Sequence, residues 1–69
     1  MFDAKANGER LKTLRTKANE TIAEAAENVG VSIASWSAYE RGKKTPRDEV
    51  KVRISDHYAT PISDIFFAD

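Results

Sequence analysis

The sequence contains no cysteine, and this absence excludes disulfides, thiolate metal sites and cysteine-based nucleophilic chemistry. No run of apolar residues approaches the length that a membrane-spanning helix needs. The chain starts Met-Phe-Asp-Ala-Lys, which offers no apolar core for a signal peptide. We therefore expect a cytoplasmic protein with no membrane partner.

An excess of charge of one sign is also lacking, because 11 basic residues balance 11 acidic ones. The charges are nevertheless unevenly placed. Residues 1–17 and 41–53 are basic, with net charges of +3 and +4, whereas residues 18–40 and 54–69 carry −4 and −3. Two basic blocks separated by an acidic one suggest surfaces that a polyanion could touch at several points, although a solvated charged face would show the same pattern.

The length of 69 residues predicts a single domain over residues 1–69. Three glycines and two prolines punctuate the chain, and no segment alternates apolar and polar residues for long enough to form a strand. The pattern predicts an all-α fold, a compact bundle of five helices. We expect the helices at about residues 6–17, 21–29, 33–41 and 48–58, followed by a short one that opens at Pro61.

The second and third expected helices are marked by their ends. Thr21 and Glu24 form a capping box, in which each side chain satisfies the other residue's backbone N–H. Gly30 suits the left-handed conformation after a helix end, and Ser32 is a good N-cap for the next helix. Because so few residues separate the two helices, they must cross steeply. The pattern therefore predicts a helix-turn-helix over about residues 21–41.

Apolar positions at helical spacing give each helix an inner face. In the fourth helix Val52 falls outside this face, and in the last helix Phe67 lies too far round to join it. Thr60 is expected to cap the last helix. The expected core residues are Leu11, Leu14, Ala18, Ile22, Ala25, Ala26, Val29, Trp36, Tyr39, Val50, Ile54, Tyr58, Ile62, Ile65 and Phe66.

The stretch from Thr21 to Pro46, TIAEAAENVGVSIASWSAYERGKKTP, resembles the helix-turn-helix of the Cro/phage-repressor family, also called XRE-like. A Gly-Val-Ser turn followed ten residues later by Glu-Arg-Gly carries most of the likeness. Segments 11–15 and 58–66 resemble that family's first helix and closing segment, so nearly the whole chain is covered. The resemblance implies a lambda-repressor-like fold and a DNA-binding function.

The resemblance also implies roles for particular residues. Arg15 and Glu40 match a pair that forms a partly buried salt bridge in the family, so we expect both to be structural. Relatives read bases with the start and middle of the third helix and grip the phosphate backbone with the loop after it. The implied DNA-binding residues are Thr21, Ser32, Ile33, Ala34, Ser35, Ser37, Ala38, Arg41, Lys43 and Lys44.

Several positions depart from the family pattern. The base-reading positions lack the Gln, Arg or Asn that relatives often carry, so direct readout would rest on Ser37 and on apolar contacts with thymine methyl groups. Ile22 replaces a frequent phosphate-binding glutamine, and Glu20 stands where an apolar residue is common. The N-terminal amides of the second helix, together with Thr21, can still anchor a phosphate.

Two other classes of function have to be considered. An enzyme is not favoured, because the single imidazole, His57, has no cysteine partner and no carboxylate cluster at ligand spacing, and a domain this small seldom builds a pocket of about 300 Å³ or more. We expect no catalytic residue. A protein-interaction module, such as an antitoxin or an antirepressor partner, could keep the fold and use apolar Ile33, Ala34 and Ala38. The basic block 41–53 beside that helix favours DNA instead.

We therefore predict a sequence-specific transcriptional regulator, a Cro-type repressor in the cytoplasm of a bacterium or a phage-infected host. Taken as a complete chain, it leaves no room for a sensor domain and would act by occupying an operator. One copy offers one recognition helix, so we expect a dimer on roughly palindromic double-stranded DNA, with half-sites about 34 Å apart. Phe67 is the expected contact of a weak homodimer. No cofactor, metal ion or small-molecule substrate is expected.

Overall fold

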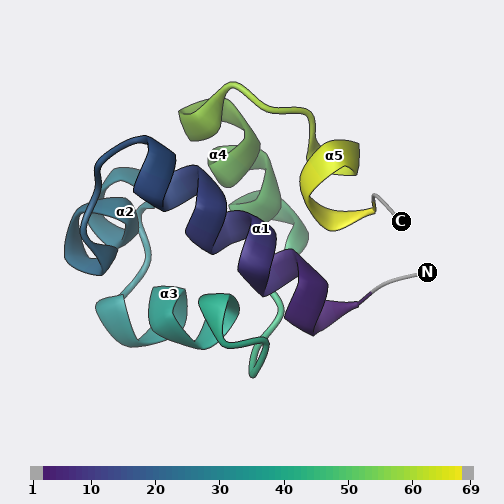
Figure 1. Ribbon diagram of the computed structural model, residues 1–69, viewed down its shortest axis with the longest axis horizontal. Coiled ribbons are helices and arrows are strands. Elements are labelled where there is room, and N and C mark those ends of the chain that lie inside the picture. The colour runs from purple at the N-terminus through teal and green to yellow at the C-terminus, as the bar shows by residue number, and fades with distance from the viewer. Residues whose placement is uncertain (1–2, 68–69) are drawn as a thin grey trace.

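The computed structural model describes residues 3–67, which form five helices joined by short loops (Figure 1). Residues 3–67 contain no strand, so the predicted all-α fold is confirmed. Within the same residues, no helix combines the length and the apolar composition needed to cross a membrane. The helices are α1 (Ala4–Lys17), α2 (Ile22–Val29), α3 (Ile33–Glu40), α4 (Asp48–Tyr58) and α5 (Ile62–Phe66).

The first helix starts two residues before its expected position because Asp3 caps it. One carboxylate oxygen of Asp3 accepts hydrogen bonds from the backbone N–H of Lys5 at 3.0 Å and of Ala6 at 3.2 Å. These bonds satisfy two of the N–H groups that a helix start leaves without a partner. The sequence prediction overlooked this cap because the apolar stripe of α1 begins only further along the helix.

The second and third helices begin and end as the local sequence predicts. Thr21 Oγ1 accepts from the N–H of Glu24 at 3.0 Å, and Glu24 Oε1 accepts from the N–H of Thr21 at 2.8 Å. Gly30 ends α2 in the left-handed conformation, at φ 84°. Ser32 Oγ then accepts from the N–H of Ser35 at 3.0 Å and starts α3. The capping box, the turn glycine and the second cap are all confirmed.

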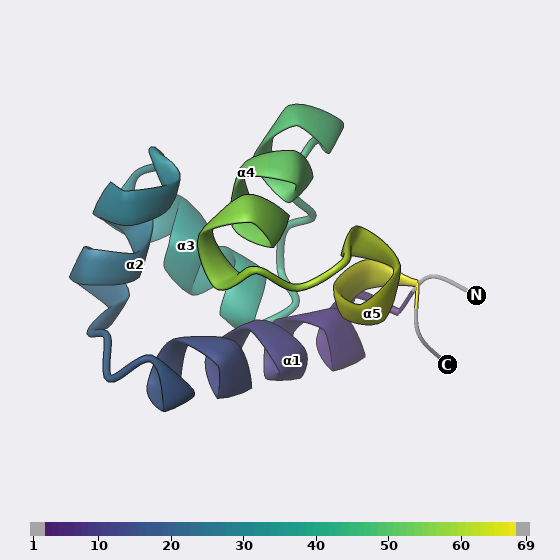
Figure 2. The same ribbon diagram turned by 90° about the horizontal axis from the view of Figure 1, so that it is seen from above.

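The helices pack around α1 and α3. α1 packs across α3, and its N-terminal half also meets α5, while α2 packs on α3 and α4 (Figures 1 and 2). α4 and α5 pack on each other and close the bundle. The turn between α2 and α3 lies at the surface, where Gly30 and Ser32 are exposed, while α2 is supported by α4 and α3 by α1.

The core is built around Trp36, whose side chain is fully buried. The ring of Tyr39 meets it edge-on at a centroid distance of 6.2 Å, and the ring of Tyr58 lies 6.3 Å away. Leu14, Ile22, Val31, Tyr58 and Ile62 are partly buried around this centre. The buried core residues are Leu11, Ala25, Ala26, Val29, Trp36, Tyr39, Val50, Ile54, Ile65 and Phe66.

A glycine within α1 permits the close approach of α1 to the end of α3. A Cβ atom at Gly8 would lie 2.5 Å from the carbonyl oxygen of Glu40 and 2.6 Å from that of Tyr39. Both atoms belong to the backbone, so a side chain here would force one helix to move. The local sequence around Gly8 gives no sign of this role, because the need for a glycine arises from a helix far along the chain.

Two expectations are wrong. Ala18, placed in the core by its spacing, is exposed, because α1 ends before it and the chain turns away through Asn19 at φ 58°. Thr60 does not cap α5: its Oγ1 donates to the carbonyl oxygen of Tyr58 at 2.9 Å. The N-cap of α5 is Pro61, which makes no side-chain hydrogen bond.

Candidate nucleic-acid interface

The third helix is anchored on one side and open on the other. Trp36 fixes one side in the core. Ile33, in the first turn of α3, is 57% exposed. Ala34 is exposed as well, whereas Ser37 and Ala38 are half-buried. The first turn of α3 therefore offers an apolar surface to solvent, and its middle lies closer to the rest of the protein.

A polar network ties α3 to α1. Arg15 Nε donates to Glu40 Oε2 at 2.5 Å and Arg15 Nη2 donates to Glu40 Oε1 at 3.2 Å. The two side chains are 12% and 7% exposed, and Trp36 Nε1 donates to the same carboxylate at 2.6 Å. The hydrogen bond to Glu40 raises the pKa of Arg15 above its ordinary value, although burial acts in the opposite direction. These two charges are therefore committed to holding α3 in place.

The N-terminal turn of α2 presents donors at the surface. The capping box uses the N–H groups of Thr21 and Glu24. The N–H groups of Ile22 and Ala23 have no intrahelical acceptor, because they lie in the first turn of the helix. The Thr21 hydroxyl accepts from Glu24 and keeps its own proton to donate. This turn can therefore donate hydrogen bonds to an anion.

The loop after α3 carries three exposed cations, Arg41, Lys43 and Lys44. Arg41 Nε donates to the carbonyl oxygen of Ser37 at 3.3 Å, and Lys44 Nζ donates to Ser35 Oγ at 3.4 Å. The loop thus folds back alongside α3, and the structure brings the expected cations next to the serines of that helix. Backbone donors therefore stand at the start of the helix-turn-helix, and positive charge stands at its end.

A second polar cluster, which the sequence analysis did not find, centres on Glu20 just before α2. Glu20 Oε1 accepts from the Tyr58 hydroxyl at 2.6 Å, and Glu20 Oε2 lies 2.5 Å from His57 Nε2 and accepts from Asn28 Nδ2 at 2.9 Å. The sequence signal that pointed here was a carboxylate at a position where relatives often carry an apolar residue. His57 is accordingly part of a contact between helices.

This cluster alters the acid–base properties of two of its members. Burial by itself raises the pKa of Glu20, but the hydrogen bonds from Tyr58, His57 and Asn28 outweigh it, so the net pKa lies below its ordinary value. Burial, reinforced by the hydrogen bond to Glu20, raises the pKa of Tyr58. The Tyr58 hydroxyl therefore stays protonated and the Glu20 side chain stays charged at neutral pH.

An apolar surface lies on α4 and α5. Val52 is 47% exposed and Phe67 is 55% exposed, as their positions off the core faces predicted. The ammonium group of Lys51 lies 5.2 Å from the ring centroid of Phe67. A hollow of about 290 Å³ is lined by Asp48, Lys51, Val52, Ile62 and Phe67.

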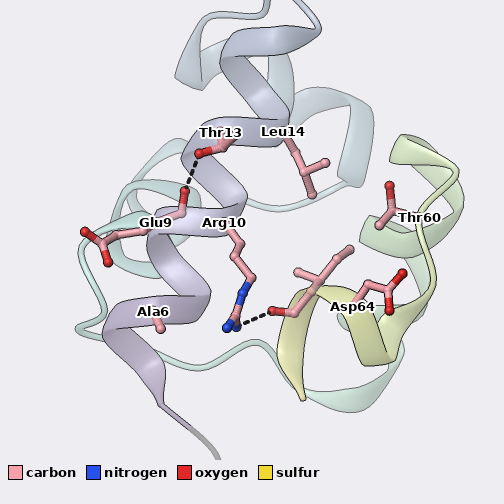
Figure 3. Close-up of a pocket in the computed structure, with 8 residues that line it drawn as sticks. Ala6, Glu9, Arg10, Thr13, Leu14, Thr60 and Asp64 are labelled. Carbon is pink, nitrogen blue, oxygen red and sulfur yellow. Dashed lines mark hydrogen bonds between the residues drawn. The ribbon is translucent and has the colours of Figure 1, made fainter. Parts of the chain in front are cut away.

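A larger hollow, of about 430 Å³, lies between α1 and α5 (Figure 3). Arg10 reaches across it from α1 and donates to the carbonyl oxygen of Ile65 at 3.1 Å and to Asn7 Oδ1 at 2.8 Å. No residue of α2 or α3 lines this hollow, so it is separate from the surface around α3. Within residues 3–67, no three His, Asp or Glu side chains are grouped to hold a metal ion.

Two short helices joined through Gly30, the second open to solvent and followed by a basic loop, define the helix-turn-helix class of DNA-binding domain. The chain matches the family model described as "Helix-turn-helix domain" over residues 8–65. It belongs to this family, in its Cro/phage-repressor or XRE-like branch, whose members are DNA-binding transcription regulators.

Similar proteins support this membership. The transcriptional repressor RstR of the cryptic phage CTXphi, from Vibrio cholerae serotype O1, is 35% identical over 57 residues, which cover 83% of this chain and 51% of RstR. The P22 c2 repressor, solved in complex with a synthetic operator, gives a TM-score of 0.86 at 27% identity, covering 91% of this chain and 96% of that one.

A third comparison concerns the fold alone. The restriction-modification controller protein C.AhdI from Aeromonas hydrophila gives a TM-score of 0.85 at 20% identity, covering 93% of this chain and 97% of that chain. The chain spans about half the length, or less, of the curated relatives that it matches.

Proposed function

We propose that this chain is a sequence-specific transcriptional repressor of the Cro type, which binds double-stranded DNA with α3 in the major groove and acts by occupying an operator. The observation that carries the proposal is the exposed outer face of α3, fixed by buried Trp36 and continued by the basic loop. The P22 c2 repressor, 27% identical to this chain, was solved on operator DNA. The proposal places the protein in the cytoplasm and requires no cofactor.

Phosphate contacts come from both ends of the helix-turn-helix. The Thr21 hydroxyl and the first-turn amides of α2 form one anchor, at the end of the helix that favours negative charge. Arg41, Lys43 and Lys44 form the other. Ser32 and Ser35, which stand at the start of α3, complete the contact surface. These contacts set the position of α3 on the duplex and carry little sequence information.

Base recognition rests on the outer side chains of α3. Ile33 and Ala34 are exposed and apolar, so they suit the methyl group of thymine, while Ser37 can donate or accept a hydrogen bond and Ala38 lies beside it. Sequence-dependent DNA shape adds specificity at untouched base pairs. Replacing thymine by uracil in the half-sites should weaken binding, and Ile33→Ala should abolish the difference between thymine and uracil at the contacted position.

A homodimer is part of the proposal, because one recognition helix gives limited affinity and half-sites lie about 34 Å apart. The apolar surface around Val52 and Phe67 supports a small contact on α4 and α5. We expect pairing in the micromolar range or weaker, reinforced by DNA. Phe67→Ala should keep the fold and convert operator titrations to independent half-site occupancy. Unchanged affinity of this variant for the full operator would show that Phe67 is not the dimer contact.

Selection of binding sequences from random duplex DNA tests the proposal as a whole, and we expect a roughly palindromic motif to be enriched. Affinity for that motif should fall steeply with salt, with a log–log slope of about −5 if a dimer neutralises ~6 phosphates. Replacing Lys43 and Lys44 by alanine should flatten the slope and leave the sequence preference unchanged. A slope near zero would contradict the proposal.

A protein-interaction module is the second candidate, and one observation favours it. Ile33, at the start of α3, is 57% exposed, and an apolar side chain there also suits a groove on a protein partner. If this candidate is right, the selection enriches no motif. The variant in which alanine replaces Lys43 and Lys44 then shows the same salt dependence as the parent.

A further inference from the structure

Side chains of α4 hold both ends of α2. At the N-terminal end, His57 and Tyr58 contact the carboxylate of Glu20 at 2.5 Å and 2.6 Å. At the C-terminal end, Arg53 Nε donates to the carbonyl oxygen of Val29 at 2.8 Å. Arg53 and His57 are four residues apart and so lie on one face of α4. One face of α4 therefore contacts both ends of α2, whose start and stop are set by its own caps.

Glu20 is fixed from its other sides as well. Arg15 Nη1 donates to the main-chain carbonyl of Glu20 at 2.8 Å, and Asn28 Nδ2 donates to its carboxylate at 2.9 Å. The Glu20 side chain is 10% exposed. Hydrogen bonds to a carboxylate are short and directional, so they hold it in one place. Because Thr21 follows directly in the chain, a movement of Glu20 is passed on to the first turn of α2.

We propose that His57 and Tyr58 are positioning residues for DNA binding, which act by holding Glu20 and thereby placing the N-terminal amides of α2 against a DNA phosphate. The inference rests on the proposed function, since the phosphate is the ligand of those amides. Neither side chain touches DNA in this scheme. The partially exposed histidine and the partly buried tyrosine thus acquire a role that α3 alone does not explain.

The geometry indicates how small a displacement matters. An eight-residue helix is roughly 12 Å long, so a tilt of about 5° about one end moves the other end by about 1 Å. A shift of this size lengthens a normal hydrogen bond beyond its useful range. Arg53 keeps the C-terminal end of α2 in place, so loss of the Glu20 contacts should tilt the helix about that end. The phosphate contact should then weaken, while α3 keeps its position and its base preference.

The test compares the double variant His57→Ala/Tyr58→Phe with the control Ser55→Ala. Phenylalanine retains the ring that packs near Trp36. Ser55 lies on the same helix and donates to the carbonyl oxygen of Thr60 at 2.6 Å, so its replacement removes a hydrogen bond of α4 that does not involve α2. Affinity and salt dependence are measured on the selected operator, at a temperature at which thermal melts show every variant to be fully folded.

For the double variant we expect about tenfold weaker operator binding, the size of one lost hydrogen-bonded contact. The salt slope should become flatter by about 1 for each phosphate lost, and the base preference should not change. The amide resonances of Ile22 and Ala23 should shift in the free protein. Ser55→Ala should match the parent in operator affinity, in salt slope and in the amide resonances of Ile22 and Ala23. The variant His57→Gln/Tyr58→Phe restores a hydrogen-bond donor to Glu20 at position 57, and it should recover most of the operator affinity.

Other results overturn the inference. An unchanged salt slope, or unmoved amide resonances of Ile22 and Ala23, would show that these contacts do not place the α2 N-terminus. An equal loss of affinity in Ser55→Ala would show a general effect of weakening α4. Failure of the proposed function is a separate result, because the parent protein itself would then lack salt-dependent binding to DNA.

Discussion

The helix-turn-helix, formed by α2 and α3, is stabilised differently from the closing region, formed by α4 and α5. Both α2 and α3 start with side-chain caps, made by Thr21 and Ser32, and α2 ends at Gly30. Neither α4 nor α5 has a side-chain hydrogen bond at its N-cap, and α4 ends at Ala59, a non-glycine residue with φ 49°. The first region carries its own start and stop signals, whereas the second depends on burial of apolar side chains such as Ile54.

This difference determines how substitutions should act. Removal of a local cap loosens one helix end and leaves the remaining contacts in place. Removal of a side chain shared by both regions loosens the whole domain, because a core this small has few other contacts to rely on.

The largest effect should follow from Trp36→Ala, because Trp36 of α3 is fully buried and packs near Tyr58 of the closing region. Truncation of a buried tryptophan costs about 3–5 kcal/mol, which approaches the whole stability of a small domain. Thermal melts followed by circular dichroism should show a variant that is unfolded or nearly so. A melting temperature within a few degrees of the parent would place Trp36 outside the core.

Gly8→Ala should have the next largest effect, because the new Cβ would lie 2.5 Å from the backbone oxygen of Glu40. Overpacking of this kind costs about 1–3 kcal/mol, which exceeds the gain of about 1 kcal/mol in helix propensity. Urea unfolding measures the change. Lys12→Ala, an exposed substitution on the same helix, is the control and should be nearly neutral. If Gly8→Ala is as stable as the parent, α1 and α3 are not in tight contact.

A pair of threonine substitutions compares the two regions directly. Thr21→Ala should lower the free energy of unfolding by about 1 kcal/mol, because it removes the cap of α2. Thr60→Ala should cost less, because the Thr60 hydroxyl bonds to the carbonyl of Tyr58 and does not cap α5. Both values come from urea unfolding, with Thr21→Ser as the variant that keeps its cap. Equal losses at the two sites would remove the contrast between the regions.

The smallest effect concerns Glu20, which links the two regions. The pKa of Glu20 lies below its ordinary value of 4.5, so the charged form is favoured by folding. Its contribution to stability is complete above about pH 4.5 and is lost as the pH falls further. Glu20→Gln should therefore flatten the decline of stability in acid relative to the parent. Glu27→Gln, at an exposed position of α2, should leave the decline unchanged, and identical profiles for both variants would contradict the prediction.

Much of the helix-turn-helix could be predicted because its signals are local. Thr21 and Glu24 lie within one turn of each other, and Gly30 acts through its own backbone. The inner faces of the helices followed from spacing, which failed only where a helix ended sooner, as at Ala18. The prediction that Thr60 caps α5 was wrong, because a threonine before a proline is a weaker signal of a helix start than a full capping box.

The residues that the prediction missed act over long distances in the chain. Gly8 is needed because α1 crosses the end of α3, and Glu20 acquires its role from His57 and Tyr58 at the far end of α4. Nothing in the local sequence of either residue shows these partners. Glu20 stood out as a departure from the family pattern, but only the packing of α4 on α2 gave it a physical explanation.

The sequence by itself determined the all-α fold, the helix-turn-helix and the anchoring of α3 by Trp36, because caps, turns and apolar spacing act between neighbours in the chain. The tertiary structure decided how closely α1 approaches α3, which charges are paired inside and what holds the ends of α2. These features depend on distances between segments that are far apart in the chain. Such distances exist only once the whole core has packed, so no local pattern could specify them.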